Sequence, residues 1–297
     1  MSVGGVEWIC FKLGEIFMDL IKGREIADEI LENLREKISQ LEAKPTLAVL
    51  LIGEDEASRI YVGLKQKAAE SIGMNFELFK YGSETEEKEI LAKIKELNDD
   101  EKVSGMIVQL PLPDGLDKEK IINSIKPEKD VDGFCDENQN NFCCGGECKI
   151  FPVFPKAIVK MVEAAIVKNS LKDIKSGMII CNSDDFGKIM REALYKIGIE
   201  AEYFFCKDLE NNLDKIKKAD VIVTACGVAG MLENSMTKDG AIVIDGGITK
   251  VDGKVRGDVE IETFENSNSF ISPVPGGVGP VTVACLLENT FLAGSKK

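Results

Sequence analysis

Two hydrophobic patterns alternate along the chain. Short continuous apolar runs predict strands that are buried on both faces, and segments in which apolar residues return every three or four positions predict amphipathic helices. In the first half, strands are expected at TLAVLLIG (46–53), NFELFKYG (75–82) and SGMIVQL (104–110). A turn and a helix are expected over 18–42, and further helices at 57–72, 84–97 and 118–124, followed by a Cys-, Asn- and Gly-rich loop at 130–149.

The second half repeats this alternation of strands and helices. Strands are expected at 177–182, 201–206, 219–226 and 240–247, and helices at 156–167, 187–197, 209–217 and 281–292. Apolar strands that alternate with helices indicate parallel sheets in an α/β fold. The two halves meet near Phe151 to Pro155, and the last helix is apolar enough to pack back on the first half.

Composition agrees with a soluble globular protein of about two domains, since the chain has 297 residues and 44% of them are hydrophobic. The N-terminus carries Glu7 and Glu15 and lacks a basic segment, so we do not interpret it as a signal peptide. No stretch approaches the ~20 apolar residues of a membrane span. The 51 acidic residues outnumber the 37 basic ones, which argues against nucleic-acid or anionic-membrane partners.

Histidine is absent from the sequence, and this restricts the available chemistry. Ser-His-Asp triads, Cys-His pairs and histidine-ligated zinc are excluded. If the protein is an enzyme, proton transfer must fall to Lys, Tyr, Cys, Asp or Glu with a shifted pKa, or to a cofactor.

Nine cysteines, an odd number partly inside apolar runs, suggest reduced thiols and a cytoplasmic location. Four of them form a cluster: Cys135, Cys143, Cys144 and Cys148. Because their spacing is unlike the paired CxxC of a zinc ribbon, we favour a thiol-rich loop over a metal site.

Several polar residues stand where open α/β folds bind ligands, near the carboxyl ends of strands. Tyr61 and Lys65 are four apart and share one helix face, either as a site with a lysine of lowered pKa or as a solvated surface pair. Gln109 ends a strand and either faces a cleft or simply terminates pairing. Asp130 and Asp132, in KDVDGF, are typical of a turn.

The order and context of these residues resemble one family. Six segments are similar to those of bifunctional methylenetetrahydrofolate dehydrogenase/methenyltetrahydrofolate cyclohydrolases: PTLAVLLIGEDEASRIYVGLKQKAAESIGM, GMIVQLPLP, IKPEKDVDGF, AIVIDGGI, VDGKVRGDV and ISPVPGGVGPVTVACLLENT. The resemblance runs from about residue 18 to 293. It implies an α/β fold with an N-terminal catalytic domain, a Rossmann-type nucleotide-binding domain and a cleft between them. The expected bounds are 1–155, completed by the helix in 281–297, for the first domain and 156–280 for the second. The family also suggests a homodimer.

The resemblance assigns a role to each matching residue. Lys65 matches the catalytic lysine, Gln109 the glutamine that hydrogen-bonds it, Tyr61 the tyrosine along the folate ring and Asp132 the aspartate that holds the pterin. The wider substrate site is expected to include Val108, Leu110, Pro275, Gly276, Gly277, Val278 and Gly279. Arg59 and Lys67 are candidates for the anionic tail of folate, by position only.

Where the resemblance places NADP or NAD, the motif is altered. The residues expected to bind the coenzyme are Cys181, Asn182, Ser183, Gly187, Asp208, Gly227 and Ile248. The glycine and arginine of the family's G-R-S are replaced by Cys181 and Asn182, while Asp184 and Asp185 stand where a helix N-terminus receives the pyrophosphate. Either Asp208 accepts from a ribose 2′-hydroxyl, which favours NAD, or Asp184 and Asp185 are helix N-caps of a domain that no longer binds a dinucleotide.

The PCTPxG of the family is also altered here, to Pro152-Val153-Phe154-Pro155-Lys156-Ala157, which predicts a different cleft shape near the hinge. We therefore expect a folate one-carbon enzyme that interconverts methylene-, methenyl- and 10-formyl-tetrahydrofolate. Two alternatives stay open: a cyclohydrolase without dinucleotide binding, and a non-catalytic folate-binding or structural partner subunit.

Overall fold

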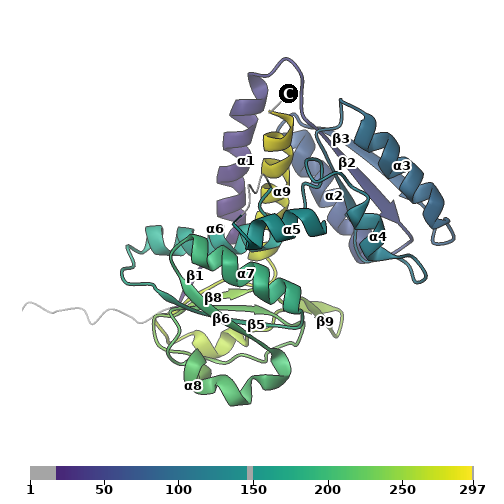
Figure 1. The fold of residues 1–297 in the computed structure, drawn as a ribbon. Coiled ribbons are helices and arrows are strands. Elements are labelled where there is room, and N and C mark those ends of the chain that lie inside the picture. Colours follow the sequence, from purple (N-terminus) through teal and green to yellow (C-terminus); the bar gives the residue numbers. More distant parts are fainter. Residues whose placement is uncertain (1–17, 146–149, 296–297) are drawn as a thin grey trace, which may run out of the picture.

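Two parallel sheets, each covered by helices, make up the computed structural model, which describes residues 18–145 and 150–295 (Figure 1). The first sheet has three strands in the order β3-β2-β4, with bounds β2 Thr46–Ile52, β3 Asn75–Tyr81 and β4 Gly105–Gln109. Every residue of β2 is buried, because it is the central strand and both of its faces are covered. The expected α/β class is confirmed.

The two faces of this sheet carry different helices. Val49, Leu51 and Ile107 pack on the side of α1 Gly23–Ser39 and α2 Glu56–Ser71, whereas Leu50 and Val108 face α3 Glu87–Asp99 and α4 Lys118–Asn123. Successive residues of a strand point to opposite faces, so this division decides which end-of-strand side chains can meet α2.

The second sheet has six strands in the order β1-β11-β8-β7-β5-β6, and each pair is parallel. Its strands are β1 Asp19–Leu20, β5 Ser176–Cys181, β6 Glu200–Phe205, β7 Val221–Ala225, β8 Ile242–Asp245 and β11 Phe270–Ile271. The helices of this half are α6 Val153–Lys168, α7 Asp184–Lys196 and α8 Leu213–Ile216, and a small hairpin of β9 Thr249–Val251 and β10 Lys254–Arg256 follows β8.

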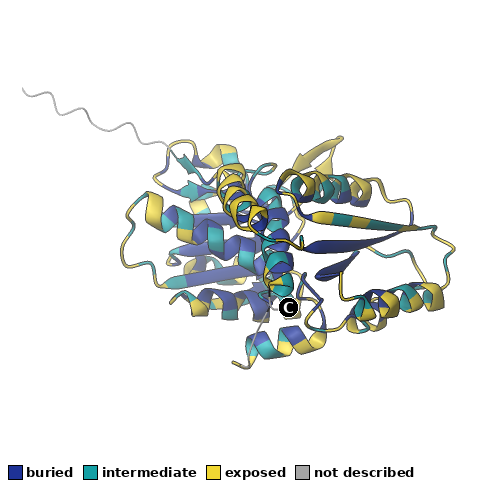
Figure 2. Ribbon diagram, turned by 90° about the horizontal axis from the view of Figure 1, so that it is seen from above, coloured by how far each residue is buried: buried dark blue, intermediate teal, exposed yellow. Residues whose placement is uncertain are grey.

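The last helix, α9 Val278–Gly294, returns to the first half as predicted. It contacts α1, α2 and α6 as well as β2 and β4, and Figure 1 shows it side by side with α1. In Figure 2 the central strands of both sheets and much of α9 are coloured as buried. The helix therefore joins the cores of the two halves.

Three local predictions were wrong. The expected turn at the start of the 18–42 segment contains β1, which pairs with β11 of the second sheet. The loop predicted at 130–149 contains α5 Asp136–Cys143, anchored by buried Phe142, whose ring centroid lies 4.6 Å from that of Phe151. The helix predicted at 209–217 is reduced to short 3₁₀ turns and the four residues of α8.

The prediction of reduced thiols is contradicted at one place, since Cys206 and Cys226 form a disulfide. Cys135, Cys143 and Cys144 are free, and Cys148 lies outside the described residues. Burial and the nearby Asp130 raise the pKa of the Cys135 thiol to about 12, which disfavours its use as a metal-binding thiolate. Within 18–145 and 150–295, no group of three potential metal ligands lies together, and no helix has both the length and the apolarity to cross a membrane.

Candidate active site

A helix cap and a strand end bring Lys65 to Gln109. Helix α2 begins after Asp55, whose carboxylate accepts a hydrogen bond from the Ser58 backbone N–H at 2.6 Å. The Ser58 hydroxyl donates to the Leu110 carbonyl at 3.3 Å, which ties the first turn of α2 to the end of β4. Two turns further along α2, Lys65 Nζ donates to Gln109 Oε1 at 2.8 Å.

The Gln109 side chain has a fixed orientation. It follows the strand alternation and points to the α2 face, opposite to Val108. Its Nε2 donates to the Leu110 carbonyl at 2.7 Å, so that Oε1 is directed at Lys65. The Gln109 side chain therefore faces Lys65 and does more than terminate strand pairing.

The two aspartates of the KDVDGF segment have separate environments. Asp130 is buried, and its carboxylate accepts from the backbone N–H groups of Gly133 and Cys135 and from the Asn138 amide, so it stabilises the turn. Asp132 is half-buried and close enough to Lys65 for their charges to interact. The first aspartate is structural, and the second belongs with the lysine.

Burial shifts both charged groups toward their neutral forms. Removal from water lowers the pKa of Lys65, and the negative charge of Asp132 offsets part of this change. Burial also raises the pKa of Asp132 to about 6, against the effect of the Lys65 cation and helped by Asp130. A lysine with a lowered pKa beside an amide and a carboxylate is a candidate for proton transfer.

The remaining residues predicted for the substrate site are placed differently from one another. Tyr61 lies half-buried one turn before Lys65, on the same face of α2. The side chain of Val108 points into the core on the face of the sheet opposite to α2. Only the backbone atoms of Val108 are therefore outside that core. Leu110 is half-buried and continues the strand end beyond Gln109.

The glycine loop reaches the first half through a close backbone contact. Pro275, Gly276 and Gly277 lead into α9, which includes Val278 and Gly279. A Cβ atom on Gly23 of α1 would lie 1.8 Å from the Gly277 carbonyl oxygen, so Gly23 allows the loop to rest on the start of α1.

Between the two halves lies a cavity of about 390 Å³. It extends from Leu110 and Ile122 of the first half to Ser183, Asp185 and Phe186 of the second. Lys65 is not part of its lining, but Leu110, the residue after Gln109, is.

The hinge residue Phe154 lines this cavity. The Phe154 ring packs on Phe186 of α7 with ring centroids 5.4 Å apart. It also lies so close to Gly246 that a Cβ there would be 2.8 Å from its Cζ atom. Two aromatic rings therefore form one wall of the cleft.

The predicted coenzyme residues gather at the carboxyl edge of the six-stranded sheet. Cys181 ends β5, and Asn182 and Ser183 follow it. Asp208 follows β6 in a 3₁₀ turn, and Gly227 follows β7 beside Ile248, whose carbonyl oxygen lies 3.8 Å from the position of a Gly227 Cβ. This edge is where doubly wound sheets bind dinucleotides.

Gly187 is required for packing of α7 on the sheet. A Cβ atom there would meet the Tyr203 ring of β6 at 2.4 Å. This matches the role of the third glycine in dinucleotide-binding motifs, which allows the helix to approach the strand closely.

The helix cap and the charges of this loop differ from the prediction. The N-cap of α7 is Ser183, whose hydroxyl accepts from the Phe186 N–H at 3.3 Å, whereas Asp184 and Asp185 are the first helical residues. Asp184 is paired with Lys188 and accepts from the Tyr203 hydroxyl at 2.7 Å. Hydrogen bonds from these two partners lower the pKa of Asp184. Its charge is therefore partly neutralised, and Asp185 is the one that lines the cleft.

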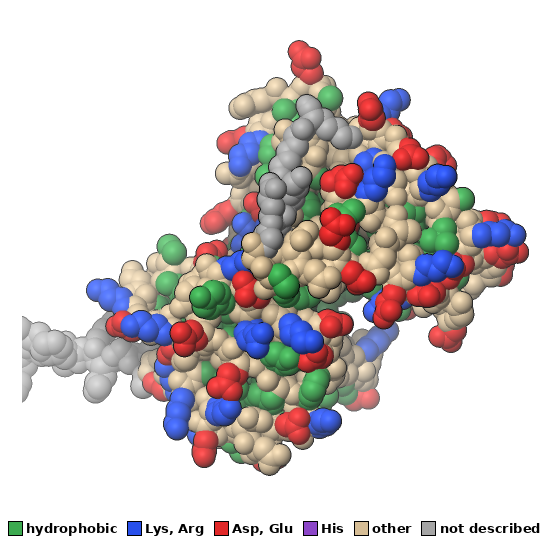
Figure 3. Space-filling view, in the orientation of Figure 1, with side chains coloured by type: hydrophobic (Ala, Val, Ile, Leu, Met, Phe, Trp, Pro, Cys, Tyr) green, Lys and Arg blue, Asp and Glu red, His purple; other side chains and the backbone are tan. Residues whose placement is uncertain are grey.

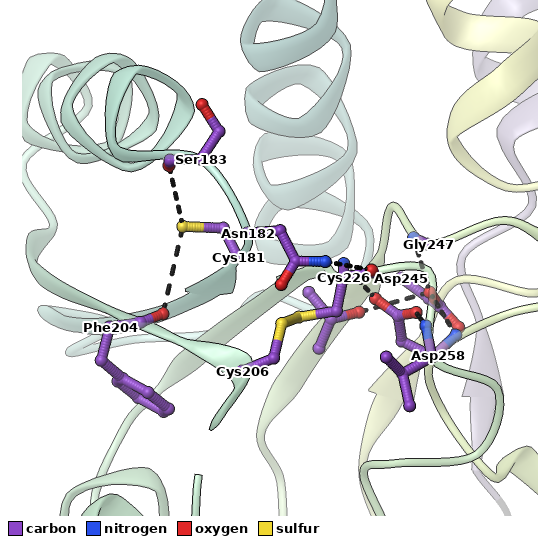
Figure 4. The surroundings of a disulfide bond; sticks show 11 residues. Cys181, Asn182, Ser183, Phe204, Cys206, Cys226, Asp245, Gly247 and Asp258 are labelled. Carbon is purple, nitrogen blue, oxygen red and sulfur yellow. Dashed lines mark hydrogen bonds between the residues drawn. A yellow bond between two sulfur atoms is a disulfide. The ribbon is translucent and has the colours of Figure 1, made fainter. Parts of the chain in front are cut away.

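The Cys206–Cys226 disulfide crosses the same edge (Figure 4). The Asn182 amide donates to the Cys226 carbonyl, and the Cys226 N–H donates to the buried Asp258 carboxylate at 2.7 Å. Sequence reasoning missed this bridge. The available signal was that both cysteines directly follow strands of one parallel sheet, and so lie at the same edge.

The two basic candidates for an anionic tail lie on the surface. Arg59 forms an ion pair with Glu54 at 2.9 Å, and Lys67 is exposed on the following turns of α2. On the face shown in Figure 3, acidic and basic side chains are interspersed over both halves of the molecule.

Comparison with known proteins places both halves in one family. Residues 21–132 match the tetrahydrofolate dehydrogenase/cyclohydrolase catalytic domain, and 152–297 match the NAD(P)-binding domain of the same family. The bifunctional protein FolD of Pelagibacter ubique is 41% identical over 278 residues, which cover 92% of this chain and 97% of that protein.

Solved structures agree with these matches. The bifunctional methylenetetrahydrofolate dehydrogenase/cyclohydrolase of Campylobacter jejuni has a TM-score of 0.87 at 36% identity, covering 94% of this chain and 99% of that one. The corresponding enzyme of Trypanosoma brucei, solved with NADP and an inhibitor, has a TM-score of 0.86 at 28% identity and covers 94% and 98%.

Proposed function

Since this chain belongs to the tetrahydrofolate dehydrogenase/cyclohydrolase family, we propose that it catalyses two reactions in sequence. The first oxidises 5,10-methylenetetrahydrofolate to 5,10-methenyltetrahydrofolate with NAD(P). The second hydrolyses the product to 10-formyltetrahydrofolate. Both parts of the family are matched, so the comparisons give no support to a cyclohydrolase without dinucleotide binding or to a non-catalytic subunit.

The observation that carries the proposal is the Lys65–Gln109 hydrogen bond at 2.8 Å beside Asp132. Water attacks the electron-poor methenyl carbon and loses a proton as the new C–O bond forms, while the C=N π electrons move to nitrogen. The bond between that carbon and N5 then breaks, N5 takes up a proton, and the formyl group stays on N10. A neutral Lys65 amine can accept the proton that the water loses, because burial lowers its pKa. Gln109 holds the amine in place, and the carboxylate of Asp132 can accept from the N–H groups of a pterin ring.

The oxidation step requires a hydride acceptor, which NAD(P) supplies when bound. No histidine is needed for this step, in agreement with the composition. Tyr61 provides an aromatic surface one turn from Lys65 that can position the folate. The loop at 275–279, which leads into α9, is the further substrate contact that the family resemblance implies.

The residues around the dinucleotide site suit the coenzyme in several respects. The N-terminus of α7 presents free backbone N–H groups after Ser183, Gly187 lets the helix approach β6, and Asp208 follows β6. A carboxylate at Asp208 accepts from a ribose 2′-hydroxyl and repels a 2′-phosphate, which supports NAD over NADP. The Cys206–Cys226 disulfide across this edge is the main feature that does not fit the coenzyme.

The test is to follow methylenetetrahydrofolate oxidation with NAD and with NADP separately, alongside hydrolysis of methenyltetrahydrofolate, using protein kept reduced. We expect both reactions, with faster oxidation in NAD. Hydrolysis without oxidation by either coenzyme would contradict the dehydrogenase assignment, and absence of both reactions would contradict the proposal as a whole.

We further propose a cytoplasmic homodimer, on the basis of the family resemblance and of a cysteine content dominated by free thiols among the described residues. Sedimentation at several protein concentrations tests the dimer, which predicts twice the mass of the 297-residue chain.

A further inference from the structure

We propose that Cys206 and Cys226 are a thiol–disulfide modification site that controls access of the dinucleotide to the six-stranded sheet. In the bridged form the coenzyme site is closed, and in the dithiol form it is open. This inference rests on the proposed function, since its ligand is the NAD(P) of the oxidation step.

The first argument is the position of the bridge relative to the strands. In the order β8-β7-β5-β6, strand β5 lies between β6, which Cys206 follows, and β7, which Cys226 follows. Strands two positions apart in a sheet are separated by roughly 9.6 Å, yet the Cα atoms of Cys206 and Cys226 are 6.3 Å apart. The segments after β6 and β7 therefore converge over the carboxyl end of β5.

The second argument is that this volume is the one a dinucleotide needs. In doubly wound sheets the pyrophosphate lies over the end of the first strand of the motif, here β5, and the ribose reaches an acidic residue after the next strand, here Asp208 after β6. Figure 4 shows the sulfur atoms of the bridge beside Asn182, the residue that directly follows β5. The bridge and an adenosine group would compete for the same space.

The third argument concerns which part can move. Cys226 is buried and is held by two hydrogen bonds: its N–H donates to Asp258 at 2.7 Å, and its carbonyl accepts from Asn182. Cys206 is half-exposed and belongs to the short 3₁₀ turn Cys206–Asp208. Cleavage of the bridge therefore frees the turn that contains Asp208, while Cys226 keeps its place.

The chemistry is a thiol–disulfide exchange. In opening, the thiolate of a dithiol reductant attacks Cys206, the more accessible sulfur, and expels the Cys226 thiolate, which takes up a proton. The second thiol of the reductant then displaces the Cys206 thiolate. The protein gains two electrons and two protons, and the reductant becomes a disulfide. Closing is the reverse exchange with a disulfide oxidant.

The experiment compares coenzyme binding by the oxidised and the reduced protein. Dithiothreitol produces the dithiol form, maleimide labelling with mass spectrometry measures the state of Cys206 and Cys226, and calorimetry measures NAD and NADP affinity. We expect the reduced form to bind its preferred coenzyme at least about tenfold more tightly. Hydrolysis of methenyltetrahydrofolate, which uses Lys65, should have the same rate in both forms.

Two variants complete the design. Cys206→Ser removes the bridge and should bind coenzyme as the reduced protein does, whatever the redox treatment. Cys144→Ser, at an exposed free cysteine, is the matched control and should keep the full redox dependence.

The outcomes separate this inference from the proposed function. Equal coenzyme affinity of the oxidised and reduced forms, with methylenetetrahydrofolate oxidised in both, would overturn the modification site alone. If the reduced protein and Cys206→Ser bind neither coenzyme and oxidise no methylenetetrahydrofolate, the dehydrogenase assignment and this inference both fail.

Discussion

Replacement of Gln109 by methionine tests how the site positions Lys65. Gln109 Oε1 accepts from Lys65 Nζ at 2.8 Å, and methionine has a similar length without an oxygen acceptor. Loss of a hydrogen bond to a charged group costs about 1.5–3 kcal/mol. If the bond contributes fully in the transition state, kcat/KM for methenyltetrahydrofolate hydrolysis should fall roughly 10- to 150-fold.

The pH profile of the same variant separates positioning from general damage. A carbonyl oxygen that accepts from Lys65 favours the protonated amine, so its removal lowers the pKa of Lys65 further. The rising limb of the hydrolysis rate, which reports the neutral amine, should therefore move to lower pH. Gln109→Glu places a negative charge at the same atom and should move that limb to higher pH.

The matched control is Gln66→Met, on the same helix. Its Nε2 donates to Glu70 at 2.8 Å on the exposed surface, so the loss of this bond should leave the rate and the profile unchanged. Stopped-flow absorbance of methenyltetrahydrofolate across a pH series provides both quantities. A rate and profile of Gln109→Met equal to those of the unsubstituted protein would refute the role of Gln109.

Two further predictions concern the second half. Burial alone would raise the pKa of Asp220, but hydrogen bonds from Lys238, Lys175 and Ser176 hold this pKa below its usual value. The stability that the Asp220 carboxylate provides is therefore present above about pH 4 and is lost as the pH falls through the lowered pKa. Asp220→Asn should therefore lower the free energy of unfolding in urea by about 2–4 kcal/mol at neutral pH, with a difference that shrinks in acid; a constant difference would contradict this. Gly187→Ala places a Cβ 2.4 Å from the Tyr203 ring and should cost about 1–3 kcal/mol by thermal unfolding, whereas an unchanged melting temperature would show that α7 can move away freely.

Strands that are buried on both faces were predictable because a continuous apolar run is a local signal. All seven residues of β2 are buried, as the run TLAVLLI implies. By contrast, β1 and β11 have two residues each, and they pair although one lies near residue 19 and the other near residue 270. Pairing between strands so far apart in the sequence depends on how the two halves of the chain pack together, which no local pattern encodes.

In the candidate site, too, features set by local spacing were predictable and features set by tertiary packing were not. Tyr61 and Lys65 share a helix face by spacing alone, but local reasoning could not decide whether Gln109 meets them, because that depends on the face of β4 turned toward α2. The resemblance to a family implied the hydrogen bond between Lys65 and Gln109, which the structure contains. It did not indicate the Cys206–Cys226 bridge, since pairing two cysteines requires knowing that β5 lies between β6 and β7.

The central claim is that Lys65 is the proton-transferring group of the hydrolysis step, and Lys65→Met tests it most directly. Methionine preserves the length of the side chain and removes the amine that contacts Gln109. Hydrolysis of methenyltetrahydrofolate by the purified, folded variant should fall to the uncatalysed rate, while folate binding measured by calorimetry persists. A hydrolysis rate equal to that of the unsubstituted protein would contradict the account.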